Sequence, residues 1–193
     1  MAAVEGSGPV SVTPSRVNPL ASLYPLELEV DFGRHTFLIP AHPAAWWLEY
    51  LLDDPVHYDI FPDCLSDADQ DLVTDAILDG DVTERDVIET ILKVIEVASG
   101  RRWWITLNIC AVARASWDLV GGQLSLQGID VRTVPLGAWL DAAYRIMLQQ
   151  LADSDPKKVP TFVAQIQAAP EGFADESGED EESDAFLAAM QQG

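Results

Sequence analysis

The sequence predicts a mainly α-helical domain of five to six helices with an N-terminal β-hairpin and a disordered tail at each end. Apolar residues recur at helical spacing from residue 43 to residue 167, whereas strict alternation is confined to residues 26–30. A chain of 193 residues can bury a sizeable single core. We therefore expect a flexible segment over residues 1–23, a folded domain over 24–168 and an acidic tail over 169–193.

The first ordered unit is a predicted hairpin. Apolar residues alternate with glutamates over residues 26–30, which is the period of a half-buried strand. Residues 31–34 contain Gly33 and supply a turn, and residues 36–39 form the returning strand. Because two strands are at best marginally stable alone, we expect the hairpin to pack on helices.

Prolines, capping residues and glycines mark the predicted helix ends. Pro43 suits the first position of a helix that ends at about residue 52. Ser66 and Thr83 are each followed three residues later by an aspartate, which is a variant of the capping box. Gly80 follows the last apolar residues of the helix that begins at Ser66, and Gly100 follows those of the helix that begins at Thr83. These two glycines therefore predict where the helices end.

The second half of the chain predicts three further elements. A fourth helix begins near Trp103 and runs to Leu119, after which Gly121 and Gly122 loosen or break it. Whether the next four residues continue as helix or form an extended piece stays open. Pro135 begins a clearer fifth helix with one continuous apolar face, and a last short element follows it.

The charge of the chain excludes several classes of partner. With 32 acidic and 11 basic residues, the formal net charge is −21. A surface of that sign repels nucleic acid phosphates and anionic lipid headgroups, so we expect neither nucleic acid nor membrane binding. The most apolar stretch, residues 103–113, is too short to span a bilayer. Cys64 and Cys110 predict reduced, buried thiols of a cytosolic protein.

One acidic motif invites comparison with a calcium-binding loop. Asp67, Asp69 and Asp71 have the spacing with which such loops begin. Leu72 occupies the position that requires glycine, and Leu78 the position that requires a bidentate glutamate. A helix cap explains the same aspartates without a metal.

No residue pattern predicts catalysis. The histidines and cysteines lack the spacing of zinc ligands, and the chain has neither a nucleophile elbow nor a phosphate-binding glycine loop. We therefore expect no enzymatic activity, no cofactor and no metal.

Two pairs of adjacent tryptophans are candidate binding residues. Neighbours on a helix point in different directions, so one member of each pair should fill the core and the other should lie near its edge. Trp47 and Trp103 are our candidates for the outer, partner-binding members, since tryptophan is enriched at the centres of protein interfaces. The alternative, that all four side chains belong to the core, stays open.

The C-terminal residues 170–193 combine eight carboxylates and no basic residue with a short apolar motif. The carboxylates should keep this tail extended. Phe186, Leu187 and Met190 would share one side of a short helix that is too small to be stable alone. We predict that these three residues fold against a partner, although a purely solvating tail remains the alternative.

Five short blocks resemble one protein family. They read FLIPA at residues 37–41, ASGRRWW at 98–104, SWDLVGG at 116–122, LGAWLDA at 136–142 and DAFLAAM at 184–190. Their order and spacing resemble the tail assembly chaperones of long-tailed, siphovirus-type phages that infect actinobacteria.

The resemblance implies a non-enzymatic assembly factor. Such proteins bind the long, apolar tape-measure protein in the host cytoplasm, keep it soluble and help tail-tube subunits polymerise around it. A longer form made by translational frameshifting is often a further partner, and the chaperone is not expected in the mature virion. Two alternatives are a virion structural protein, such as a head–tail completion or minor tail subunit, and an acidic DNA mimic. A homo-oligomer also stays open.

Overall fold

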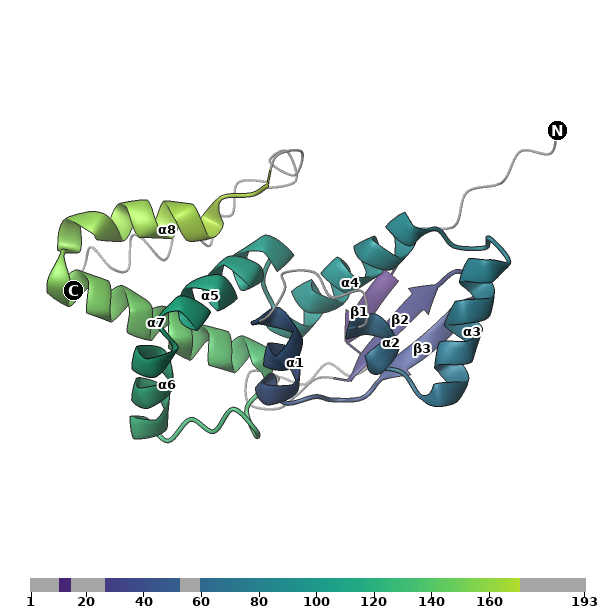
Figure 1. Ribbon diagram of the computed structural model, residues 1–193, viewed down its shortest axis with the longest axis horizontal. Coiled ribbons are helices and arrows are strands. Elements are labelled where there is room, and N and C mark those ends of the chain that lie inside the picture. The colour runs from purple at the N-terminus through teal and green to yellow at the C-terminus, as the bar shows by residue number, and fades with distance from the viewer. Residues whose placement is uncertain (1–10, 15–26, 53–59, 171–193) are drawn as a thin grey trace.

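The computed structural model describes residues 11–14, 27–52 and 60–170, which form a three-stranded sheet and eight α-helices (Figure 1). The predicted mainly helical fold with an N-terminal hairpin is confirmed. The described part has more helices than predicted, because Ile60–Asp63 forms a short helix (α2) and the predicted fourth helix is divided in two. The acidic tail lies outside the described residues.

The sheet is antiparallel in the order β1-β2-β3. Strands β2 (Leu28–Phe32) and β3 (His35–Ile39) form the predicted hairpin, and Gly33 has the positive φ of 60° that its two-residue turn requires. Strand β1 (Ser11–Pro14) adds to the free side of β2. The sequence predicts a flexible segment there, since a strand of four residues is too short to show periodicity.

One face of the hairpin belongs to the core, and the other faces solvent. Helix α4 (Glu84–Ser99) packs against β1 and β2. Phe61 of α2 contacts Phe32 and Phe37, with ring centroids 5.4 and 6.2 Å away. The buried side chains of the hairpin alternate along both strands: Leu28, Val30, Phe32, Phe37 and Ile39. This alternation confirms the predicted strand period from residue 28 to residue 30, whereas Leu26 lies outside the described residues.

Except for α3, which lies at the sheet end, the remaining helices form a bundle at the other end of the molecule from the sheet (Figure 1). Helix α7, the longest, lies at its centre and contacts α1, α4, α5, α6 and α8. Its buried face includes Trp139 and Leu140, which are fully buried. The bounds of the helices not yet given are α1 (Ala44–Leu51), α3 (Asp67–Leu78), α5 (Trp103–Ala115), α6 (Trp117–Leu126), α7 (Leu136–Ser154) and α8 (Val159–Gln167), with a 3-10 turn at Pro156–Lys158 before α8.

The predicted helix starts at residues 66 and 83 are confirmed in atomic detail. The Asp86 amide donates to Thr83 Oγ1 over 3.3 Å, and the Thr83 amide donates to Asp86 Oδ2 over 2.7 Å, which completes a capping box. The Ser66 side chain accepts from the Asp69 amide over 3.3 Å and begins α3. The three aspartates of the calcium-like motif therefore lie in the first turns of a capped helix.

The predicted break at Gly121 and Gly122 is wrong, because both glycines lie inside α6. The chain breaks instead at Ser116, where α5 ends and α6 begins. The Ser116 hydroxyl donates to the Val112 carbonyl over 2.8 Å, and its amide is shared between the carbonyls of Val112 and Ala113. A serine that bonds back to the preceding turn competes with the continuing helix and bends the chain.

Candidate protein-binding surface

The first predicted binding residue, Trp47, is only 3 % exposed. Its assignment as the outer member of its pair is therefore wrong, and the half-buried member is Trp46. The buried residues of α1 follow helical spacing and include Ala44, Trp47 and Leu51, so Trp46 lies at the rim of that face.

Trp46 belongs to a row of three rings in contact at the edge of the core. The His42 imidazole stacks on Trp46 at a centroid distance of 4.1 Å, and Tyr50 lies 4.8 Å away on the same helix. Tyr50 donates a 2.6 Å hydrogen bond to Asp63, which ties α1 to the end of α2. Within the part of the chain that the structure describes, His42 Nε2 is buried without a hydrogen-bond partner, and desolvation lowers the pKa of His42.

For the second pair the predicted orientation is confirmed. Trp103 is half-buried at the start of α5, and Trp104 fills the core beside it at a centroid distance of 5.6 Å. Glu96 of α4 accepts from the Trp103 amide over 3.3 Å, which satisfies one donor of the α5 N-terminus. Binding of a partner by Trp103 stays a prediction. Phe186, Leu187 and Met190 lie outside the described residues.

Helix α6 exposes more apolar side chain than its packing explains. Asp118 is its only charged residue, yet its buried residues are Val120 and Leu124 alone. Leu126 is 82 % exposed, and Trp117 and Leu119 are each 40 % exposed. A helix side that carries large apolar residues is normally covered by other protein. An uncovered one on an acidic chain therefore marks a candidate interaction site.

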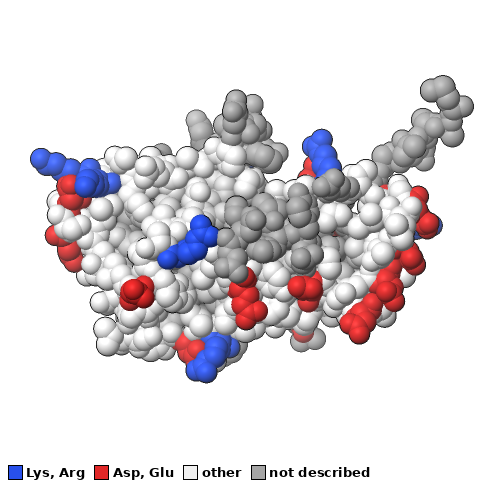
Figure 2. Space-filling model, viewed as in Figure 1, with Lys and Arg blue, Asp and Glu red and all other residues white. Residues whose placement is uncertain are grey.

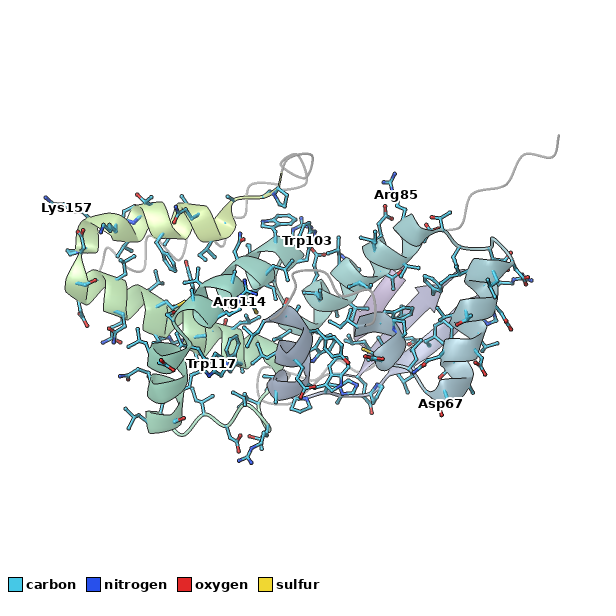
Figure 3. The ribbon with its side chains drawn as sticks, viewed as in Figure 1. Asp67, Arg85, Trp103, Arg114, Trp117 and Lys157 are labelled. Atoms are coloured by element: carbon cyan, nitrogen blue, oxygen red, sulfur yellow. The ribbon has the colours of Figure 1, made fainter. Side chains whose placement is uncertain are left out.

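Beside α6 lies an open pocket of about 480 Å³, between this helix and the segment that leads to α7. Trp117, which is labelled beside α7 in Figure 3, forms part of the pocket wall. Its ring stacks on the buried Trp139 of α7 at a centroid distance of 6.3 Å and an interplanar angle of 29°. The pocket is lined by Trp117, Gly121, Leu124, Ser125, Gly128, Ile129, Asp130, Val131 and Arg132.

The charges on the pocket wall cancel locally. Arg132 Nη2 donates to Asp130 Oδ2 over 2.9 Å, and this hydrogen bond lowers the pKa of Asp130. The pocket therefore offers apolar surface and a closed ion pair, without an isolated charge. Because an α-helix has about 3.6 residues per turn, Leu119 and Leu126 lie on the side of α6 away from Trp117 and this pocket. We call the exposed side chains of Leu119 and Leu126 the α6 surface.

The acidic side chains gather elsewhere on this face of the molecule. Figure 2 shows red carboxylates along the side that holds α3, whereas the region of α6 is mainly white. The sequence carried one signal for the α6 surface that our prediction did not use, namely a helix of ten residues with a single charge.

The described ranges contain no group of three or more histidine, cysteine, aspartate or glutamate residues that could hold a metal ion. Within the same ranges, no helix is long and apolar enough to cross a membrane. Comparison of the chain with protein-family models, with curated proteins and with solved structures finds no match.

Proposed function

We propose that this protein is a non-enzymatic tail assembly chaperone that binds the tape-measure protein and keeps it soluble while tail-tube subunits polymerise around it. The α6 surface is the observation that carries the proposal, because it is uncovered apolar helix on an otherwise acidic chain. The identity of the client comes from the resemblance of the short sequence blocks. Two of these blocks supply the stacked rings of Trp117 and Trp139.

The physical chemistry of the client suits this surface. The resemblance implies a long, apolar and helical client, which would aggregate if its apolar face stayed in water. Laying that face on Leu119 and Leu126 removes apolar area from water at about 25 cal/mol per Å². The net charge of −21 then keeps the complex soluble and discourages its self-association.

Co-expression with the tape-measure protein tests the function directly. We expect the wild-type chain to move the client from the pellet to the soluble fraction. A client that stays equally insoluble with and without the chain would overturn the chaperone function. The longer frameshifted form and the tail-tube protein are the next partners to test in the same assay.

A matched pair of substitutions tests the surface separately from the function. Leu126→Asp places a carboxylate on α6 at a side chain that is 82 % exposed, and Leu78→Asp does the same on α3 at one that is 77 % exposed. Neither change should unfold the domain. We expect only Leu126→Asp to reduce the solubilised client, and equal effects of the two variants would rule out the α6 surface.

Purified virions separate this function from a structural role. A chaperone leaves the particle after assembly, so mass spectrometry of mature virions should not detect the chain. Its presence at a fixed number of copies per virion would favour a head–tail completion or minor tail subunit.

A further inference from the structure

Among the described residues, the outer edge of β3 ends the sheet with unpaired backbone groups. In the order β1-β2-β3, β3 has one strand neighbour, and the hairpin closes with the pair Phe32 and His35 around a two-residue turn. In an antiparallel pair, alternate residues direct both backbone groups to the neighbour. The amides and carbonyls of Thr36 and Leu38 therefore point away from β2. Within the described ranges, no backbone hydrogen bond reaches them.

Strand β3 itself lacks the sequence features that normally protect an edge strand. Proteins usually place lysine, proline or a bulge there. The five residues of β3 include neither lysine nor proline, and its register with β2 is continuous. Leu38 is 58 % exposed, although it lies in the middle of the returning strand. At the opposite side of the sheet, α4 packs against β1.

The solvent face of the hairpin is acidic next to this edge. Glu29 pairs with Leu38 and Asp31 pairs with Thr36 across the two strands, and all four side chains are exposed. The Thr36 hydroxyl donates to Asp31 Oδ1 over 2.7 Å, which holds that carboxylate beside β3. A lysine or arginine on a strand added outside β3 is long enough to reach across it to these carboxylates.

The opposite face of an added strand would lie on the core side of the sheet, where the neighbouring side chain at the centre of β3 is apolar. Phe37 is 3 % exposed and lies on the core side of β3, between the two outward-pointing residues. Side chains of an added strand alternate between the faces, so every second residue would lie beside the apolar core. The edge thus suits a strand that is cationic on one face and apolar on the other.

We propose that the outer edge of β3 is a strand-addition site for an extended segment of a partner protein in which lysine or arginine alternates with apolar residues. Backbone hydrogen bonds to Thr36 and Leu38 supply the pairing, and Glu29 and Asp31 select the charge. The inference uses none of the α6 surface and does not depend on the tape-measure protein being the client.

A fluorescent peptide of about six residues that alternates lysine with valine is the probe, since this is the usual length of a strand. Fluorescence anisotropy with the full chain should show saturable binding that weakens as salt is added. The double variant Glu29→Gln with Asp31→Asn should bind more weakly. A glutamate–valine peptide should not bind, and equal affinity of the two peptides would overturn the proposal.

Proline at residue 38 tests the backbone pairing itself. Leu38→Pro removes an amide that points away from β2, so the hairpin keeps its own ladder. Leu38→Thr is the matched control, because it removes the leucine side chain but keeps the amide. We expect roughly tenfold weaker binding for Leu38→Pro than for Leu38→Thr, the order of one lost hydrogen bond. Equal binding would exclude strand addition.

Methylated peptides keep the test decisive if Leu38→Pro does not fold. Methylation of one alternate set of peptide amides blocks the bonds to β3, whereas methylation of the other set alters only amides that face solvent. The peptide methylated at the amides that face β3 should no longer bind the wild-type chain. The peptide methylated at the solvent-facing amides should bind nearly as well as the unmethylated one. Equal loss or equal retention with both sets would overturn the proposal.

Discussion

Gly137 of α7 lies so close to Ser99, the last residue of α4, that a β-carbon on the glycine would stand 2.8 Å from the serine carbonyl oxygen. Ser99 is itself held in place, because its hydroxyl accepts from the Arg101 amide over 3.2 Å and from Thr106 Oγ1 over 2.9 Å. The missing side chain of Gly137 therefore sets how closely α4 and α7 approach, and with them the sheet end and the bundle end of the molecule.

Gly137→Ala should lower the free energy of unfolding by about 1–3 kcal/mol, the usual cost of forcing a group into a packed site. The β-carbon would meet backbone atoms that cannot rotate away. Gly122→Ala is the control, because a β-carbon at Gly122 in α6 meets nothing within 4 Å. That variant should gain about 0.5–1 kcal/mol from helix propensity. Urea unfolding measures both, and equal stabilities would contradict the predicted clash.

The glycines show which parts of the fold a sequence can predict. Gly80 and Gly100 end helices as predicted, with φ values of 74° and 70°, because a left-handed terminus is a local property. The effect of Gly121 depends on its neighbours, since the Trp117 ring lies 3.5 Å from the place of its missing β-carbon. The role of Gly137 depends on a helix 38 positions earlier in the chain, at Ser99.

In the candidate site, too, local features were predictable from the sequence and features that depend on distant packing were not. The capping pair Thr83 and Asp86 was predictable because both partners lie within one turn. Which member of the pair Trp46 and Trp47 is buried depends on how α1 is rotated against its neighbours, and the pair alone does not contain that information. The exposure of Leu126 likewise depends on what fails to pack against α6.

An ion pair between Arg101 and Asp141 should contribute modestly to the same junction. Arg101 lies between α4 and α5, bonds to Asp141 on α7 and stands over the Tyr144 ring at 6.0 Å. Arg101→Ala should cost about 0.5–1.5 kcal/mol, since the pair is partly exposed and the arginine stem also packs. Arg101→Met keeps the stem and should recover part of the loss. If the stability differences among wild type, Arg101→Ala and Arg101→Met do not change with salt concentration, packing of the arginine side chain alone would account for the loss.

Both cysteines should be unreactive in the folded protein. Burial raises the pKa of Cys64 and of Cys110 to about 12, and Cys64 Sγ also donates to the Ile60 carbonyl over 2.9 Å. At about pH 8, roughly one thiol in ten thousand would then be ionised, and the thiolate is the reactive form. A disulfide reagent should label both thiols rapidly in guanidinium and very slowly without it. Rapid labelling of the native Cys64→Ser variant would contradict the buried position of Cys110.

The partly buried imidazole of His42 should make the domain less stable in acid. Desolvation lowers the pKa of His42 below its ordinary 6.5, so the native state binds this proton less tightly than the unfolded state does. As the pH is lowered through 6.5, the unfolded chain binds this proton before the native protein does. The free energy of unfolding therefore decreases as the pH is lowered, until the pH reaches the native pKa of His42. His42→Phe keeps a ring on Trp46 and removes this dependence. Urea unfolding from neutral pH to about pH 5 compares the two proteins, which share their remaining histidines. Parallel curves would contradict the prediction, and an NMR titration of His42 would show its pKa directly.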